Sequence, residues 1–343
     1  MLGYYGIMAS VGFVLGLVLG GLLVETVDWR GVFFVNVPIC LLGAAAGTRL
    51  VPPGAPTGPR PHLDLATALL VTSGVAALVY VPTAGVDNGW TSAPFLGALG
   101  LSAALIVAFV QRERHTAQPL VPLSLFRSTT LAAGDVVTLL VGAWIAGEVL
   151  LLTLYLQQVR GFSPLVAGLI FLPQGLGGML RGAIGPAVVA RVGIRRFLIA
   201  SATLSAVGLG LLLRFPATSQ EPLLEVVLLV IGFGSTCTLF AATVAGSAGV
   251  RNEEQGLASG LINMTRQVGS AVGVAMLFAI ASAVARAQGG SATAVADGYR
   301  ESMGPIAVLA VIAIVVSVRF VHDDVNAANP EHLRRRHLVS PAS

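Results

Sequence analysis

The stretch GYYGIMASVGFVLGLVLGGLLVETVDWRGVFFVNVP, residues 3–38, indicates the fold class. Its first part is an almost uncharged run, and about 20 apolar residues suffice to cross a ~30 Å hydrocarbon core as a helix. Glycine weakens helices in water, but in lipid it allows helix backbones to approach closely. The recurrent glycines are Gly3, Gly12, Gly16, Gly20 and Gly21. The stretch therefore predicts a membrane-spanning helix that packs tightly through the face carrying Gly12, Gly16 and Gly20.

The composition of the whole chain predicts a polytopic membrane protein. Of its 343 residues, 55% are hydrophobic and 10% are charged, and the mean hydropathy is +0.85. A soluble domain carries about 25% charged residues, so this chain cannot cover a water-soluble globule. All 20 basic residues are arginines that lie between apolar runs, as the positive-inside bias produces, which argues against a nucleic-acid partner. Cys40 and Cys237 both lie within apolar runs and are predicted to be small core residues.

The apolar runs predict an all-α protein with about ten membrane spans. Short turn-forming segments separate most of them, and longer proline-rich linkers follow the second and fourth spans. The expected spans are residues 3–24, 31–50, 64–86, 94–111, 130–156, 164–189, 195–214, 223–247, 256–285 and 303–321.

Arginine distribution predicts the orientation of the chain in the membrane. With a cytoplasmic N-terminus, thirteen arginines fall on the cytoplasmic face, among them Arg49, Arg191 and Arg334 to Arg336, and five fall outside, among them Arg30 and Arg286. This imbalance predicts that both termini are cytoplasmic.

The chain also contains a weak internal repeat. Gly3, Gly12 and Gly16 in the first span have the same spacing as Gly260, Gly269 and Gly273 in the ninth. Both spans are expected to run outwards from the cytoplasm, as in transporters built from two related halves. In a chain this rich in glycine, the match can also arise by chance.

Several stretches together resemble the major facilitator superfamily, in particular its fourteen-helix EmrB/QacA-type branch of drug/proton antiporters. The glycine pattern of residues 3–21 is similar to the antiporter motif of the fifth helix, which in the family lies between the two halves and helps to seal the cavity. WRGVFFVNVP at residues 29–38 resembles the start of the sixth helix. YLQQVRGFS at residues 155–163 resembles the junction between the ninth and tenth helices, and ASGLINMTRQVG at residues 258–269 resembles the thirteenth helix.

The resemblance also has departures. Leu17 stands where the antiporter motif normally has a proline, and Ala190 replaces an aspartate of the cytoplasmic loop motif. The other residues that match that loop motif are Gly185, Arg191, Gly193, Arg195 and Arg196.

If the first span corresponds to the fifth helix of the family, four helices are absent, so the chain resembles an N-terminally truncated transporter. The resemblance implies four parts: residues 1–50 as the last two helices of an N-terminal bundle, 51–127 as two linker helices with cytoplasmic loops, 128–321 as a six-helix C-terminal bundle, and 322–343 as a cytoplasmic tail.

Four ionisable residues lie inside predicted spans and are therefore candidates for a functional site: Asp135, Glu148, Arg181 and Arg266. Inserting each of them into the membrane costs about 2.5–3.5 kcal/mol. By helical rise, Asp135, Arg181 and Arg266 share an inner layer, so an Asp135–Arg181 ion pair is geometrically reasonable. Such a pair would be a structural alternative to proton coupling by Asp135. Arg266, in the run with Asn263, is expected to pair with a carboxylate or to line the translocation path.

Glu148 lies ~20 Å further out along the same helix as Asp135, with no arginine at its depth. An unpaired carboxyl in a low dielectric can load and release protons near neutral pH, which makes Glu148 the better candidate for a proton carrier. The alternative, that Glu148 only shapes the electrostatics of a wet cavity, stays open. Four aromatic residues could line a pocket for flat cations or belong to the core: Trp144, Tyr155, Phe171 and Phe240.

These observations lead to the hypothesis of a plasma-membrane secondary transporter that exchanges protons for amphiphilic small molecules or drugs. No catalytic arrangement, cofactor motif, metal-ligand spacing or phosphate-binding loop is recognisable, so we expect neither an enzyme nor an ATP-driven pump. The alternative is a remnant or partial subunit that transports nothing without further N-terminal helices.

Overall fold

The computed structural model describes residues 2–50, 64–116, 119, 121, 126, 128–213, 221–248, 250, 255–289 and 292–322. Within these ranges all regular elements are helices, which confirms the predicted all-α class. The helices are α1 (Leu2–Thr26), α2 (Trp29–Phe34), α3 (Asn36–Leu50), α4 (Leu65–Asn88), α5 (Ala93–His115), α6 (Thr129–Leu154) with a π-helical turn η2 (Tyr155–Val159), α7 (Pro164–Ile170), α8 (Leu172–Val192), α9 (Ile194–Leu212), α10 (Glu221–Gly246), α11 (Gln255–Ala287) and α12 (Ala292–Phe320).

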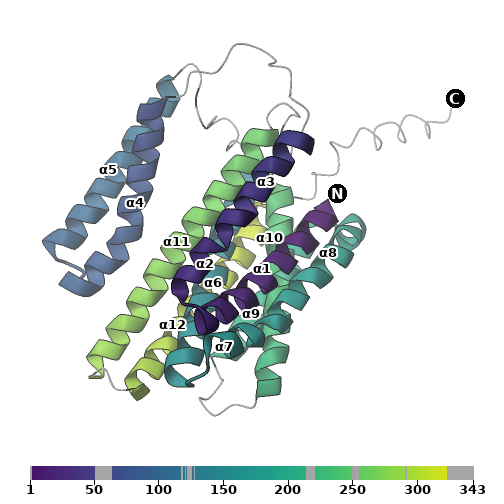
Figure 1. Ribbon diagram of the computed structural model, residues 1–343. Helices are drawn as coiled ribbons and strands as arrows, with labels where there is room; N and C mark the ends of the chain where they lie inside the picture. Colours follow the sequence, from purple (N-terminus) through teal and green to yellow (C-terminus); the bar gives the residue numbers. More distant parts are fainter. Residues whose placement is uncertain are drawn as a thin grey trace.

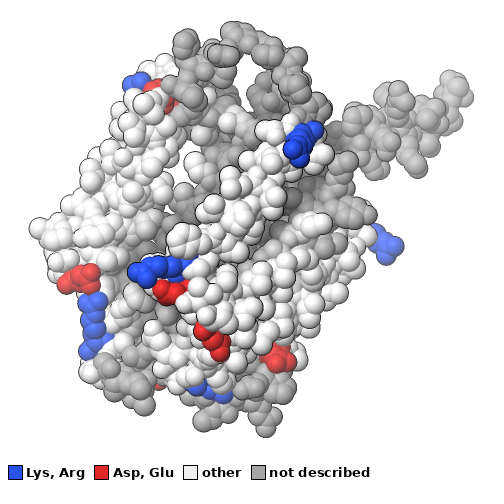
Figure 2. All heavy atoms as spheres, in the orientation of Figure 1, with Lys and Arg blue, Asp and Glu red and all other residues white. Residues whose placement is uncertain are grey.

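Nine stretches of the described residues are long and apolar enough to cross a membrane. They correspond to nine of the ten predicted spans. The remaining one, residues 3–24, falls in α1, whose segment Ser10–Thr26 is a shorter apolar helix. The surface in Figure 2 agrees with a membrane protein, since charged side chains form only small scattered groups on it. The predicted tail beyond residue 322 lies outside the described residues.

Two of the predicted spans are interrupted, and proline accounts for both breaks. The span predicted at 31–50 divides at Val35 into α2 and α3, and the span predicted at 164–189 divides at Phe171 into α7 and α8. A proline ring clashes with the carbonyl four residues earlier, which for Pro38 is that of Phe34 and for Pro173 is that of Leu169.

Serine caps set the starts of several helices. Ser92, Ser128 and Ser163 each accept a hydrogen bond from the backbone N–H three residues later, as N-cap residues do. Pro164 follows Ser163 at the first position of α7, where a missing N–H has no effect.

Helices α6 to α12 form a bundle (Figure 1), and α6 is one of its two most buried helices. Its side chains Val137, Val141, Trp144 and Leu151 have no exposed surface, and α10, α11 and α12 all pack against it. The Trp144 Nε1–H donates to Ser235 Oγ of α10 at 3.0 Å. Trp144 and Phe171 are thus core residues, which favours the core alternative for these two aromatic side chains.

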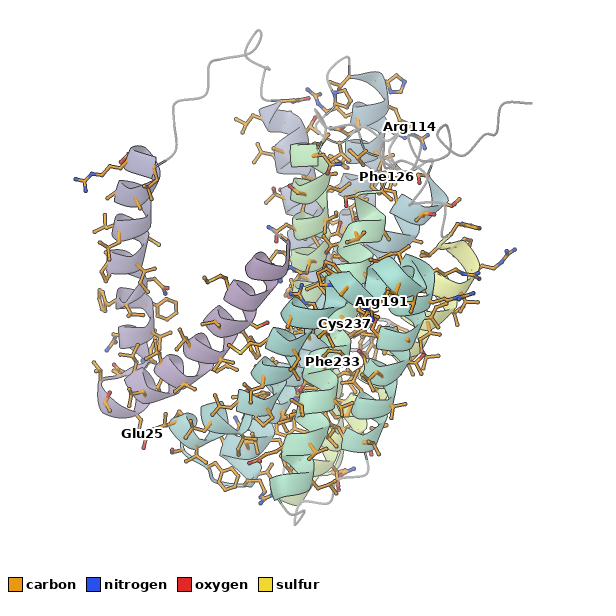
Figure 3. All side chains as sticks on the ribbon, turned by 90° about the vertical axis from the view of Figure 1, so that its right-hand side faces the viewer. Glu25, Arg114, Phe126, Arg191, Phe233 and Cys237 are labelled. Atoms are coloured by element: carbon orange, nitrogen blue, oxygen red, sulfur yellow. The ribbon has the colours of Figure 1, made fainter. Side chains whose placement is uncertain are left out.

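The first three helices are much less enclosed. Helix α1 packs against α7 and α8, but α2 and α3 have no buried residue, and α3 stands apart from the bundle in Figure 3. A Cβ added to Gly12, Gly16 or Gly20 would meet no heavy atom within 4 Å. The tight packing predicted through this glycine face is therefore not seen among the described residues, where α1 packs through another face and Gly21 lies against Pro164 and Leu165.

Helices α4 and α5 form a hairpin beside α11 (Figure 1). At one end Arg112 Nε donates to Asp64 Oδ2 at 2.8 Å and to Thr67 Oγ1 at 2.9 Å, and Arg112 Nη2 donates to Asp64 Oδ1 at 3.1 Å. The hydrogen bonds from Arg112 and Thr67 hold the pKa of the Asp64 carboxyl well below its usual range.

The division of the chain into four parts, at residues 1–50, 51–127, 128–321 and 322–343, stays a prediction.

Candidate functional site

The most enclosed ionisable side chain among those predicted for the site is Glu148. It lies on α6 with none of its surface exposed. Gln174 Nε2, from α8, donates a hydrogen bond of 2.9 Å to Glu148 Oε2. Glu148 Oε1 and Gln174 Oε1, both buried, have no hydrogen-bond partner among the described residues. The site is therefore a carboxyl–amide pair with spare acceptor capacity inside the helix bundle.

Glycines bring the helices around this pair close together. Gly177 of α8 lies against the backbone of Leu229 and Phe233 in α10, and Gly232 of α10 lies against the backbone of Gln174. Close contact of this kind is what small residues provide between membrane helices. It fixes the height at which the Gln174 side chain leaves α8 to reach α6.

Asp135 lies at the other end of α6 and is 4% exposed. Within the ranges that the structure describes, neither of its carboxylate oxygens has a hydrogen-bond partner. It lies near Gly246 at the end of α10, where a Cβ would be 3.3 Å from Asp135 Oδ1. Asp135 is therefore a second buried carboxyl, separate from the Glu148 pair.

The predicted Asp135–Arg181 ion pair is wrong. The guanidinium carbon of Arg181 lies 5.3 Å from the centroid of the Phe240 ring on α10, and no described residue bonds to Arg181 Nε. Depth along the helices put the two residues in one layer, but it did not determine which neighbour the Arg181 side chain faces. Arg181 stacks on an aromatic ring instead, an arrangement favourable for a guanidinium.

Arg266 and Asn263 are brought together by one helical turn of α11. Arg266 Nη2 donates to Asn263 Oδ1 at 3.1 Å, so the contact of Arg266 is with an amide and not with the expected carboxylate. The proposed role of these two residues in the translocation path remains a prediction.

The residues that match the cytoplasmic loop motif lie at the junction of α8 and α9. Gly193 ends α8 with a φ of +85°, a conformation that L side chains rarely adopt. Arg191 is in the last turn of α8, and Arg195 and Arg196 are in the first turn of α9. Arg195 Nη2 donates to the carbonyl of Val318 in α12 at 2.6 Å, which ties this junction to the end of the last helix. Gly185 lies in α8 beside the Arg181 side chain.

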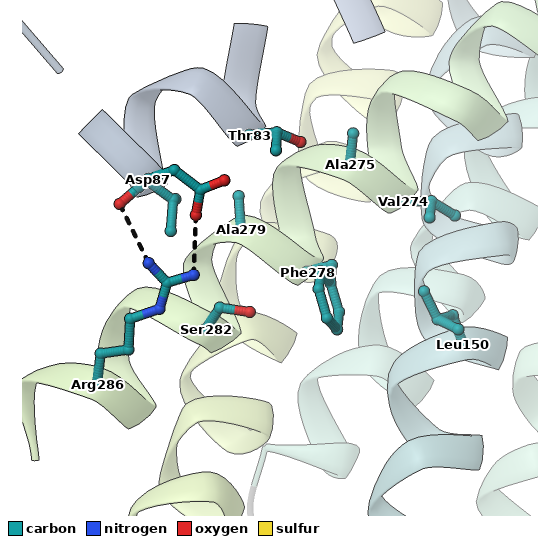
Figure 4. Close-up of a pocket in the computed structure, with 10 residues that line it drawn as sticks. Thr83, Asp87, Leu150, Val274, Ala275, Phe278, Ala279, Ser282 and Arg286 are labelled. Carbon is teal, nitrogen blue, oxygen red and sulfur yellow. Dashed lines mark hydrogen bonds and ion pairs between the residues drawn. The ribbon is translucent and has the colours of Figure 1, made fainter. Parts of the chain in front are cut away.

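A cleft of about 410 Å³ lies between α4 and α11 (Figure 4). Its walls are mostly apolar, with Val274, Phe278 and Leu150 among the lining residues. Arg286 Nη2 donates to Asp87 Oδ1 at 3.0 Å and so joins the hairpin to α11 at the edge of the cleft. None of the candidate site residues named above lines this cleft, although Leu150 in its wall lies two positions after Glu148 on α6.

The sequence does not reveal the role of Gln174, because its partner Glu148 lies 26 positions earlier on another helix. A usable signal was present: Gln174 is a polar residue followed by three glycines within four positions, in QGLGG at residues 174–178.

In the part of the chain that the structure describes, three or more His, Cys, Asp or Glu residues nowhere cluster as a metal site would require.

Comparison with known proteins gives consistent matches. The family described as Major Facilitator Superfamily matches residues 1–274. The chain is 33% identical to a puromycin resistance protein of Streptomyces alboniger, over 86% of this chain and 60% of that protein. It is 33% identical to the multidrug resistance protein Stp of Mycobacterium tuberculosis, over 82% of this chain and 52% of that protein. It is 35% identical to the cephamycin export protein CmcT of Amycolatopsis lactamdurans, over 90% and 64%. The chain thus spans between about half and two thirds of these relatives.

Proposed function

The chain belongs to the Major Facilitator Superfamily, and we propose that it contributes the proton-binding bundle of a drug exporter in which Glu148 carries the proton. The observation that carries this proposal is the fully buried Glu148 carboxyl, which accepts one hydrogen bond from Gln174 and has no other partner in the described part of the chain. A carboxyl without a neighbouring cation can be neutralised by a proton at little electrostatic penalty. It can therefore exchange a proton as the surrounding helices open and close.

The substrates that we propose are amphiphilic small molecules. Relatives named for puromycin resistance, multidrug resistance and cephamycin export support this choice. Family membership indicates a transport protein and not an enzyme. We propose that the energy source is the proton gradient and not ATP, that no nucleic acid is involved, and that the protein lies in the plasma membrane with both termini in the cytoplasm. The thirteen-to-five distribution of arginines supports that orientation.

Transport in lipid vesicles tests the proposal. An imposed proton gradient should drive uptake of an amphiphilic cationic dye into inside-out vesicles and should dissipate as the dye moves. Glu148→Gln keeps the shape of the side chain and removes the titrating proton, so it should abolish proton-driven uptake. Glu225→Gln, the same change at an exposed carboxyl of α10, is the matched control and should retain it. Unchanged proton-driven uptake by Glu148→Gln would refute the proton-carrier role.

A second candidate function is that of a partial unit, which transports only when further helices cover α1 to α3. Two observations favour it: α2 and α3 have no buried residue, and Gly12, Gly16 and Gly20 face no atom within 4 Å. Exchange by two rocking bundles needs a second bundle at this face. The same vesicle assay with and without co-produced helices 1–4 of a relative distinguishes the two: transport by the chain alone excludes this candidate.

A further inference from the structure

We propose that Gln174 is a positioning residue through which helix α1 controls the protonation of Glu148. This inference rests on the proposed role of Glu148 as proton carrier. It adds a mechanical connection: α1 lies on α8, and α8 carries the amide that holds the carboxyl.

The first step is the contact between α1 and α8. A Cβ on Gly175 would overlap the Val14 side chain of α1, and a Cβ on Gly178 would be 2.5 Å from Ser10 Oγ. No side chain of α8 intervenes at these two positions. A displacement of α1 therefore acts directly on the backbone of α8, next to Gln174.

The second step is the geometry of the hydrogen bond. Gln174 Nε2 and Glu148 Oε2 are 2.9 Å apart, near the optimum for an N–H···O bond. Such bonds weaken beyond about 3.2 Å, so a shift of α8 by a few tenths of an ångström is sufficient to change this one. Gly177 and Gly232 hold α8 against α10 beside Gln174, so only a small shift of α8 is available, and a small shift is all that the change in this bond requires.

The third step is chemical. The Gln174 N–H donates to the carboxylate and so favours the ionised form of Glu148. When the bond breaks, the carboxyl is left buried with less solvation, and the protonated form becomes more populated. Movement of α1 away from α8 thus promotes proton uptake, and close packing of α1 promotes proton release.

Other titratable groups on the helices around this layer have separate surroundings. Arg181 of α8 stacks on Phe240, Arg266 of α11 bonds Asn263, Tyr299 of α12 donates to Gln158, and Asp135 lies thirteen positions earlier on α6, or ~20 Å away. Cys237 on α10 is a buried thiol, and Glu25 on α1 accepts from Ser163 at the far end of the helix. The other described ionisable residues of α8, α10, α11 and α12 are exposed: Arg191, Glu225, Arg286, Asp297, Glu301 and Arg319. None of these groups bonds to Glu148 in the described part of the chain, so the Gln174 bond is the contact that controls it.

Infrared titration of the 343-residue chain in lipid vesicles tests this inference without requiring transport. The carboxyl band of Glu148 is identified as the one that Glu148→Gln removes. Gln174→Met keeps the chain length and removes the donor. Gln174→Met should raise the pH at which Glu148 is half-protonated by about 1–2 units, because losing one hydrogen bond to a charged group changes its protonation by roughly that amount. An unchanged midpoint in Gln174→Met would overturn the proposal.

Variants of the α1–α8 contact test the mechanical step. Gly175→Ala should push α1 away and shift the midpoint in the same direction, and Val14→Ala added to it should restore the original value by making room. In the Gln174→Met background, Gly175→Ala should add nothing. Gly16→Ala, on the open face of α1, is the matched control and should have no effect. A Gly175→Ala shift that Val14→Ala does not reverse, or that adds fully to Gln174→Met, would refute the coupling.

The two proposals fail in different ways. If the infrared midpoint shifts as expected but Glu148→Gln transports normally, the proton-carrier role is wrong and the coupling stands as a property of the bundle. If Glu148→Gln abolishes proton-driven transport but Gln174→Met leaves the midpoint unchanged, the carrier role stands and the coupling is wrong.

Discussion

Helices α1 and α11 carry the same glycine spacing but use it differently. On α11, Gly269 lies against the backbone of Leu139 and Gly273 against that of Ala143, both on α6. On α1, Gly12 and Gly16 occupy the matching positions, yet a Cβ on either would meet nothing within 4 Å. Identical spacing thus accompanies one of the closest helix contacts in the bundle and also an open face.

The difference shows what a glycine pattern determines. Small residues permit close approach, but a neighbouring helix has to be present for the approach to occur. Helix α11 has α6 beside it, and Gly142 of α6 reciprocates by lying against the carbonyl of Arg266. Helix α1 packs on α7 and α8 through a different face. Two of the glycines at this contact are on the neighbouring helices, Gly168 on α7 and Gly175 on α8.

The largest effect is expected at the α6–α11 contact. In Gly269→Ala and Gly273→Ala the new methyl groups meet backbone atoms, which cannot rotate away, and overpacking of this kind typically costs about 1–3 kcal/mol. We expect values at the upper end, measured as a lower unfolding midpoint in a denaturing-detergent titration. If both variants are as stable as the parent, the close α6–α11 contact does not exist.

A smaller and local effect is expected for Gly21→Ala. Its Cβ would be 2.6 Å from the carbonyl oxygen of Pro164 and 2.8 Å from Leu165 Cα, so α1 has to move off α7. We expect a loss of about 1 kcal/mol, confined to α1, because α1 contacts the bundle on one side only. Hydrogen exchange should accelerate in α1 and stay unchanged in α6 and α11. Equal acceleration in all three helices would mean that α1 is an integral part of the core.

The contact of Asp64 with Arg112 and Thr67 at the end of the α4–α5 hairpin contrasts with the glycine contacts, because its strength depends on pH and theirs does not. The pKa of Asp64 is lowered by its hydrogen bonds from Arg112 and Thr67. The contact therefore contributes fully above the unfolded value of about 3.9 and is lost as the pH falls through the lower folded value. Hydrogen exchange in α4 should be constant from neutral pH to about pH 4, after correction for the intrinsic rate, and should rise only below it. Asp64→Asn should remove this acid dependence; if the dependence persists, another group is responsible.

The smallest effect is expected on the open face of α1. Gly12→Ala and Gly16→Ala add a methyl group where there is free space, so their stability should stay within about 0.5 kcal/mol of the parent. The detergent titration used for Gly269→Ala provides the comparison. A loss as large as that of Gly269→Ala would show that the face is covered.

Whether a sequence prediction holds depends on which structural property its residue pattern specifies. Apolar length predicts membrane helices, and nine of the ten expected spans have the required length and hydropathy in the described residues. Proline positions explain the breaks at Val35 and Phe171, which apolar length alone does not reveal. The Asp135–Arg181 pair failed because depth does not specify the direction of a side chain, and Arg181 faces Phe240. Gln174 was missed because its partner, Glu148, lies 26 positions earlier on another helix.

The most direct test of the central claim is proton release on substrate binding. The purified chain is placed in weakly buffered detergent near neutral pH, and tetraphenylphosphonium, an amphiphilic cation, is added while the pH is followed with an indicator. If Glu148 exchanges its proton for substrate, the wild-type chain releases protons on addition of the cation, reciprocally with the effect of pH on cation affinity. Glu148→Gln should release none, whereas Asp135→Asn should still release them. Equal release by Glu148→Gln and the wild-type chain would contradict the account.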